Sequence, residues 1–137
     1  FKKDAAWGIN QLRERGHKII IITGRTSSFY TDPYKTTKEE LANGNIVYDK
    51  LICTLDKAEA CLRENISVLV DDLPVNCIAV SQKGISAIVF NSKGNRDIKT
   101  DFRRVEDWAG VLKAVIAIEQ ESGQSRQGGT QKCCFRK

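Results

Sequence analysis

Residues 16–25 have the sequence GHKIIIITGR, in which four consecutive isoleucines lie between two glycines. A run without alternating polar positions is typical of a strand that is buried on both faces, as in a parallel sheet. β-Branched side chains also favour an extended backbone. The stretch therefore predicts a central parallel strand over Lys18–Ile22, bounded by turns at Gly16 and Gly24.

Helical and extended patterns alternate on both sides of this strand. Before it, apolar residues at helical spacing predict an amphipathic helix over residues 1–15 that ends at Gly16. After it, the patterns predict a helix near Thr36–Ala42, a strand at Lys50–Cys53, a helix over Asp56–Glu64 capped near Thr54 or Asp56, a strand at Ser67–Val70, a helix over Pro74–Lys83, a strand at Ser86–Phe90 and a final helix marked by Val105, Trp108, Leu112, Val115 and Ile118. This order predicts an α/β fold, a three-layer Rossmann-like sandwich with a parallel sheet.

Length and composition indicate one globular domain. The chain has 137 residues, of which 41 % are hydrophobic and 28 % are charged, a balance that excludes a wholly disordered protein. No apolar run approaches the roughly 18 residues of a membrane helix, and no signal peptide opens the chain, so we expect a cytoplasmic protein that does not bind membranes. A start at Phe1 in helical register, without any methionine, leads us to expect a piece of a longer chain.

The net charge of +5 is concentrated at the end of the chain. Residues 122–137 contain four basic residues and no acid, which leaves about +1 for the remainder. A nucleic-acid-binding protein carries its basic face on the folded part, so this distribution argues against a nucleic-acid partner. We expect a folded domain over residues 1–120 and a disordered basic tail over 121–137, whose residues 122–137 can be deleted without changing the melting temperature by more than about a degree.

The five cysteines do not form a metal-binding pattern. Their number is odd and their spacing does not match a metal site, so we expect reduced thiols. They are Cys53, Cys61, Cys77, Cys133 and Cys134.

Polar residues gather where the predicted strands end. Ligands of open parallel sheets bind beyond the carboxyl ends of the strands. The first strand ends in Thr23-Gly24-Arg25, and the strand Ser67–Val70 ends in Asp71-Asp72, with Asn76 about one helical turn further on. Lys57 opens the helix that leads to the second of these strands. We expect all of these residues to reach one crevice.

These residue types suit phosphate chemistry. A threonine hydroxyl and a glycine amide can donate hydrogen bonds to phosphate, and a lysine can neutralise its charge. An acidic pair suits Mg²⁺, which prefers oxygen ligands.

Each feature also has a structural interpretation. The acidic pair can be a solvated turn in which Asp72 caps the Pro74 helix, Thr23-Gly24 can be a plain turn, and Lys57 can be a surface lysine. Arg25 can contact a ligand or form a structural ion pair, and His17 is expected to be exposed and without a role.

In order and spacing, these motifs resemble those of the haloacid dehalogenase-like hydrolases. Gly16–Arg25 resembles the second motif of that family, Lys57 the third, and Val68–Asp72 the fourth. Gly84–Phe90 is similar to the strand that follows, and Asp107-Trp108 is similar to the ending of the deoxyribonucleotidase-like branch, whose reaction is that of a 5′-nucleotidase. The resemblance covers about residues 1–120.

The resemblance implies a Mg²⁺-dependent phosphomonoesterase of 5′-nucleotidase type, with a small phosphorylated substrate similar to a nucleoside monophosphate. Thr23 would bind the transferring phosphoryl group with help from the Gly24 amide, and Lys57 would steady the charge between nucleophile and phosphate. Asp72 would bind Mg²⁺ directly and Asp71 through water. The resemblance leaves the role of Asn76 open, because some relatives have an acid at that position.

One motif of the family is not found. Its first motif, an Asp-x-Asp after an apolar strand, supplies the nucleophile and the general acid/base, whereas Asp4 lies within the predicted helix. We therefore expect this chain to bind Mg²⁺ weakly and to have no turnover on its own. The alternative is a non-catalytic, receiver-like or phosphate-binding signalling module. A receiver has its acidic pair first and its lysine last, so the order Thr23, Lys57, Asp71-Asp72 favours the hydrolase.

Overall fold

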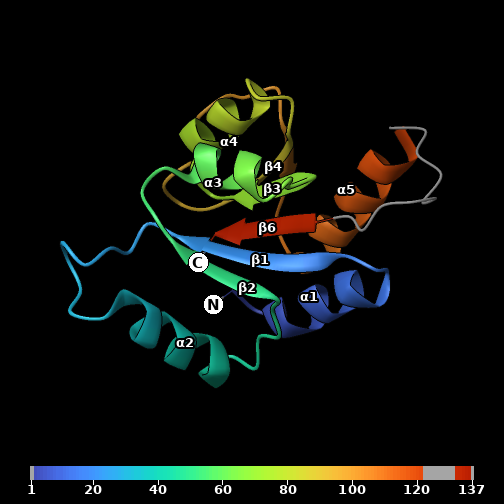
Figure 1. The fold of residues 1–137 in the computed structure, drawn as a ribbon. Helices are drawn as coiled ribbons and strands as arrows, with labels where there is room; N and C mark the ends of the chain where they lie inside the picture. The colour runs from blue at the N-terminus through green and yellow to red at the C-terminus, as the bar shows by residue number, and fades with distance from the viewer. Residues whose placement is uncertain (1, 122–131, 137) are drawn as a thin grey trace.

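The computed structural model describes residues 2–121 and 132–136, in which helices and strands alternate along most of the chain (Figure 1). The described helices are α1 (Ala5–Glu14), α2 (Pro33–Asn43), α3 (Lys57–Arg63), α4 (Pro74–Ser81) and α5 (Trp108–Glu121). The described strands are β1 (Lys18–Thr23), β2 (Lys50–Cys53), β3 (Val68–Asp71), β4 (Ser86–Phe90), β5 (Arg103–Val105) and β6 (Lys132–Arg136). The protein is α/β, as its sequence predicts.

The described strands form one sheet in the order β2-β1-β6-β3-β4-β5, and all neighbours are parallel. The carboxyl ends of β1 and β3 therefore lie at the same edge of the sheet. The prediction that Lys18–Ile22, Ser67–Val70 and Ser86–Phe90 belong to one parallel sheet is confirmed, with the middle strand shifted by one residue.

Strand β6 corrects the expectation of a disordered tail. Lys132–Arg136 lies between β1 and β3, and Phe135 pairs in register with Ile21 on one side and Val70 on the other. Glu121, the first residue assigned to the tail, is the last residue of α5. The expectation was based on local composition, which does not reveal pairing between strands far apart in sequence. Residues 122–131 and 137 lie outside the described part of the chain, so the prediction is not tested there.

The isoleucines of β1 are buried on both faces of the sheet. Ile19 and Ile21 belong to an apolar core formed with α1 and α5, whereas Ile20 and Ile22 belong to a second core formed with α3 and α4. Figure 1 shows α3 and α4 on the opposite side of the sheet from α1. This arrangement explains why the run does not alternate with polar residues.

Most of the predicted elements are present, with shifts of a few residues at their ends. Gly16 and Gly84 follow helices with φ of 93° and 81°, a conformation that glycine adopts without strain. Asp56 is the N-cap of α3 and accepts a hydrogen bond from the Glu59 amide at 3.1 Å. The apolar spacing predicts Val105 in the last helix, but this residue lies in β5. In the described part of the chain, no helix has the length and apolar character needed to cross a bilayer.

Candidate functional site

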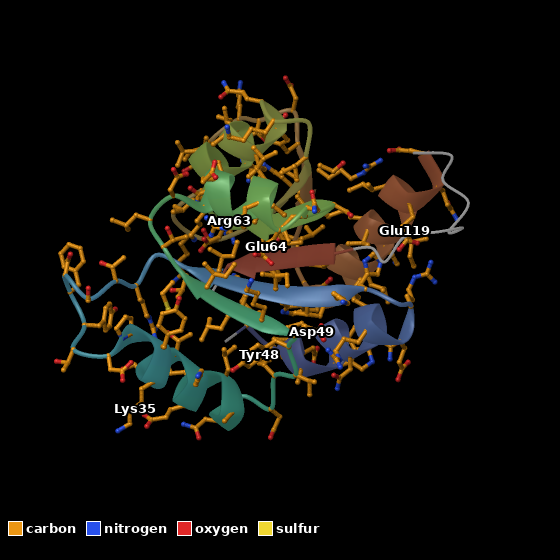
Figure 2. The ribbon with its side chains drawn as sticks, viewed as in Figure 1. Lys35, Tyr48, Asp49, Arg63, Glu64 and Glu119 are labelled. Carbon is orange, nitrogen blue, oxygen red and sulfur yellow. The ribbon has the colours of Figure 1, made fainter. Side chains whose placement is uncertain are left out.

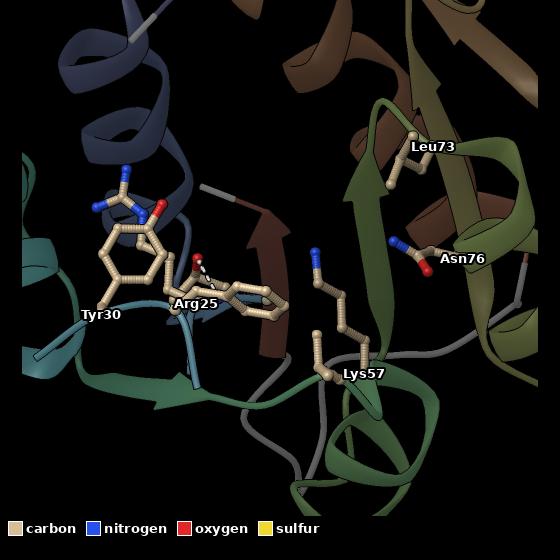
Figure 3. A pocket seen from close by; sticks show the side chains of 9 residues that line it. Arg25, Tyr30, Lys57, Leu73 and Asn76 are labelled. Atoms are coloured by element: carbon tan, nitrogen blue, oxygen red, sulfur yellow. Dashed lines mark hydrogen bonds between the residues drawn. The ribbon is translucent and has the colours of Figure 1, made fainter. Parts of the chain in front are cut away.

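A cavity of about 820 Å³ opens at the carboxyl end of the sheet (Figure 3). Its walls come from the segment after β1, the start of α3 and the turn between β3 and α4. The residues that line it are Thr23, Gly24, Arg25, Phe29, Tyr30, Leu55, Lys57, Leu73 and Asn76. The volume lies in the range of small-molecule sites, whose ligands are far larger than a phosphate ion.

Thr23 and Gly24 bring hydrogen-bond donors to this cavity. Thr23 is the buried last residue of β1, and its carbonyl accepts a hydrogen bond from the Thr54 amide at 2.9 Å. Its hydroxyl oxygen accepts a hydrogen bond from the Arg25 amide at 3.3 Å. Because a hydroxyl has one donor as well as its acceptor positions, Thr23 keeps the ability to donate toward a ligand.

Lys57 is buried beside a carboxylate and also lines the cavity. Only 6 % of the residue is exposed, so the interpretation as a surface lysine is wrong. Its Nζ lies 3.7 Å from Oδ2 of Asp71, which is itself 1 % exposed at the end of β3. The Asp71 carboxylate accepts hydrogen bonds from the Leu73 amide at 2.9 Å and from Asn76 Nδ2 at 2.8 Å. The Lys57 ammonium group is therefore held at the cavity by the Asp71 carboxylate, which two hydrogen bonds fix in place.

Asp72 lies outside the cavity lining and does not cap α4. It is partly exposed and is not among the residues that line the cavity. Its backbone carbonyl accepts a hydrogen bond from Asn95 Nδ2 at 2.6 Å. The N-cap of α4 is Leu73, without a side-chain cap, so the suggestion that Asp72 caps this helix is wrong. The local turn is stabilised by Asp71, whose carboxylate accepts the hydrogen bond from Leu73.

Of the residues expected at the crevice, the structure thus brings Thr23, Gly24 and Lys57 to one cavity. Asp71 joins them through its ion pair with Lys57, and Asp72 stays outside the lining. Asn76 lines the cavity and holds Asp71, a role that its distance along the sequence did not reveal.

The acidic residues in the described part of the chain do not form a metal site by themselves. Among them, no group of three or more histidine, cysteine or acidic residues could hold a metal ion. Both carboxylate oxygens of Asp71 already accept hydrogen bonds, and Lys57 adds a positive charge beside them. Mg²⁺ binding by this acidic pair would need further oxygen ligands, from water, phosphate or another carboxylate.

Arg25 forms the structural ion pair considered for it and also lines the cavity. It lines the cavity, and its Nη2 forms an ion pair with Oε2 of Glu40 at 2.8 Å. This hydrogen bond raises the pKa of Arg25. The guanidinium also lies over the ring of Tyr30, 5.3 Å from its centroid.

Four apolar residues of the lining were not singled out from the sequence. They are Phe29, Tyr30, Leu55 and Leu73, and all are exposed. Two adjacent aromatic residues in an otherwise polar loop were the signal that could have drawn attention to the first pair.

The opposite end of the sheet contains a second buried charged cluster. His17 is 4 % exposed, which corrects the expectation of a solvent-exposed residue, and its Nε2 contacts Oε1 of Glu119. Arg15 donates to the other oxygen of this carboxylate at 2.8 Å. Figure 2 shows Glu119 on α5, on the side of the molecule where β1 begins. Burial favours a higher pKa for Glu119, but the hydrogen bonds from Arg15 and His17 outweigh it and lower the pKa.

Searches of protein-family models, curated proteins and solved structures found no match to this chain.

Proposed function

We propose that this chain is the phosphate-binding part of a Mg²⁺-dependent phosphomonoesterase, similar to the deoxyribonucleotidase-like branch of the haloacid dehalogenase-like hydrolases. In this proposal the helices and the parallel sheet form a Rossmann-like, three-layer sandwich, and the ligand is a small phosphorylated molecule rather than a nucleic acid or a membrane. The observation that carries the proposal is the meeting of Thr23, Gly24 and Lys57 at one cavity.

Each of these groups has a place in binding a phosphate ester. The Thr23 hydroxyl and the Gly24 amide would donate hydrogen bonds to phosphate oxygens. Lys57 would compensate the negative charge, held in position by the ion pair with Asp71 at 3.7 Å. Asn76 supports this arrangement indirectly, because it donates to the same Asp71 carboxylate at 2.8 Å. Charge compensation is worth most where water is excluded, and Lys57 is buried.

The chemical step needs a nucleophile that the described residues do not supply. Asp71 is bound through both of its oxygens, and Asp72 lies outside the cavity lining. A carboxylate placed between the Thr23 side and the Asp71 side of the cavity would come from a strand between β1 and β3. That position is taken by β6. We therefore expect binding without turnover, and a strand carrying an Asp-x-Asp sequence would have to displace β6 to restore hydrolysis.

Magnesium belongs to the proposal as a cofactor of the complete enzyme. Asp72 would bind it directly and Asp71 through water, and the ion would neutralise charge on the phosphoryl group. Because the acidic residues in the described part of the chain do not form a metal site by themselves, the affinity of this chain for Mg²⁺ alone should be weak.

The test is calorimetric titration of the chain with orthophosphate. Lys57→Met and Thr23→Val should each weaken binding about tenfold or more, because each removes a contact to a charged ligand. Lys83→Met is the matched control, since Lys83 is exposed and precedes β4 at the amino end of the sheet. Equal affinity in Lys57→Met, Lys83→Met and the unchanged chain would contradict a phosphate site at this cavity.

A second function, that of a non-catalytic phosphate-binding module, is favoured by the engagement of both Asp71 oxygens. Adding a strand with an Asp-x-Asp sequence before residue 1 distinguishes the binding module from the phosphomonoesterase. Hydrolysis of a nucleoside monophosphate that is abolished by Asp72→Asn would support the phosphomonoesterase. Phosphate binding without hydrolysis in that longer chain would support the binding module.

A further inference from the structure

Apolar side chains surround the mouth of the phosphate cavity. Phe29 is 78 % exposed and Leu55 is 70 % exposed, and both line the same cavity as Lys57. Single exposed apolar residues are ordinary on protein surfaces. Here, however, Phe29, Leu55 and Leu73 come from three separate segments and meet around one opening. The cavity therefore has a polar, cationic floor and an apolar rim.

The turn that carries Phe29 and Tyr30, and the Tyr30 ring itself, are held in place by neighbouring groups. The amides of Phe29 and Tyr30 both donate to the Thr26 carbonyl, at 3.1 and 3.0 Å, which fixes the turn that carries them. The Arg25 guanidinium lies over the Tyr30 ring and is itself bound to Glu40 at 2.8 Å. The Tyr30 ring, held in this way, loses little conformational entropy when a ligand packs on it.

The two parts of the cavity face a common space. Figure 3 shows Lys57 between Tyr30 on one side and Leu73 on the other. The volume of about 820 Å³ exceeds what an inorganic phosphate would fill, so a ligand bound at Lys57 has room for a further group beside the rim.

We propose that Phe29 and Tyr30 are specificity-determining residues, which select phosphate monoesters that carry a flat aromatic ring. This inference rests on the proposed phosphate site. The phosphate would bind at Thr23 and Lys57, and the ring would stack on the aromatic rim. Flat rings gain from stacking on aromatic side chains, whereas a saturated ring of the same size gains only from apolar contact.

The experiment compares orthophosphate, cyclohexyl phosphate and phenyl phosphate by calorimetric titration. Binding is the readout, because the chain is expected to have no turnover. Phenyl phosphate should bind about tenfold or more tightly than orthophosphate, with cyclohexyl phosphate between them. Phe29→Ala and Tyr30→Leu should each reduce the advantage of phenyl phosphate and leave orthophosphate affinity unchanged. Phe29→Leu should keep part of the advantage, since it retains apolar area without an aromatic face.

Leu62→Ala is the matched control, because Leu62 is an exposed apolar residue of α3 that does not line the cavity. It should bind all three probes as the unchanged chain does. Equal affinity for phenyl and cyclohexyl phosphate, or no effect of both Phe29→Ala and Tyr30→Leu, would overturn ring selection while Lys57→Met still weakens every probe. Failure of all three probes to bind would overturn the phosphate site and the ring selection together. Circular dichroism of each variant confirms that the fold is retained.

Discussion

The two ends of the parallel sheet each bury a carboxylate beside a basic side chain. They differ in whether the basic side chain also lines a cavity. At the amino end, His17 contacts one oxygen of Glu119 and Arg15 donates to the other at 2.8 Å. At the carboxyl end, Asp71 lies 3.7 Å from Lys57, and Lys57 also lines a cavity.

The difference separates a structural cluster from a candidate site. Both oxygens of Glu119 are engaged by basic groups of the protein itself, and the cluster joins the end of α1 to α5. At the cavity, Lys57 lines the same space as Thr23 and Gly24, whose hydroxyl and amide can donate hydrogen bonds to a ligand. Burial of charge alone therefore does not identify a site, because structural ion pairs bury charge as well. The donors beside the charge make the distinction.

The largest expected effect comes from β6, the strand that lies between the two halves of the sheet. Cys134→Pro removes a ladder hydrogen bond and should destabilise the chain by about 3 kcal/mol or more, a large part of the stability of a domain of this size. Urea unfolding followed by circular dichroism measures the change, with Cys134→Ala as the control for the loss of the side chain. Removal of residues 132–137 should abolish cooperative unfolding. Unchanged unfolding of both altered chains would mean that β6 is not needed to join β1 and β3.

Two substitutions, one at each end of the sheet, sharpen the comparison because only one of them should affect phosphate binding. Glu119→Gln removes one partner of a buried charged cluster and should lower the free energy of unfolding by about 3 kcal/mol, with phosphate binding unchanged. Glu121→Gln is its control, since Glu121 pairs with Arg103 at the surface, where ion pairs contribute about 1 kcal/mol at most.

Lys57→Met should weaken phosphate binding as well as stability. It replaces a buried ammonium by an apolar group, and Asp71 keeps its hydrogen bonds from Leu73 and Asn76. Because the substitution leaves the buried Asp71 carboxylate without the Lys57 charge, we expect a loss of stability of about 3 kcal/mol together with a loss of phosphate affinity of about tenfold. If Lys57→Met left phosphate binding intact and Glu119→Gln weakened it, the assignment of the two ends would be reversed.

The amino-terminal cluster should also make stability depend on acid pH. The pKa of Glu119 is lowered below its ordinary value of 4.5 in the folded chain, because the hydrogen bonds from Arg15 and His17 outweigh the effect of burial. Its contribution is therefore present above pH 4.5 and is lost as the pH falls through the folded pKa. Urea unfolding between about pH 7 and about pH 3 should show a smaller loss of stability in Glu119→Gln than in the unchanged chain. If the free energy of unfolding fell equally with pH in both chains, Glu119 would be excluded as the titrating group.

The smallest effect is expected at Cys77, which lies on α4 beneath the carboxyl end. Burial raises the pKa of this thiol to about 12, and the charges of Asp71 and Asp72 add to the shift. Because the thiolate is the reactive form, Cys77 should resist alkylation near pH 8 in the folded chain and react after unfolding in urea. Mass spectrometry of the labelled peptides measures this, with the partly exposed Cys53 as an internal comparison. Rapid alkylation of Cys77 in the folded chain would show that the carboxyl end of the sheet opens readily.

Much of the fold could be predicted because it follows from local patterns. The isoleucine run of β1 predicts burial on both faces, and the helices next to it have apolar residues at helical spacing. Strand β5 was missed because its three residues, Arg103–Val105, include two arginines. Strand β6 was missed because Lys132–Arg136 has basic ends and follows a segment rich in glycine and glutamine. Its place depends on pairing with strands more than 60 residues away.

The candidate site could be predicted in part for the same reason. Strand ends and helix starts are local features, and they place Thr23 and Lys57 at one edge of the sheet. The pairing of His17 with Glu119 spans 102 residues, so no local pattern indicates that this histidine is buried. The sequence does not predict the apolar rim, because Phe29 and Leu55 lie in separate segments that meet only in the folded chain.

The most direct test of the distinction between the two ends is a titration with orthophosphate followed by amide chemical shifts in NMR spectra. A phosphate site at the carboxyl end predicts that the amides of Gly24, Arg25 and Lys57 shift with one common binding curve, while the amides of His17 and Glu119 do not move. Shifts centred on His17, or small shifts spread over the basic residues of the surface without a response at Gly24, would contradict it.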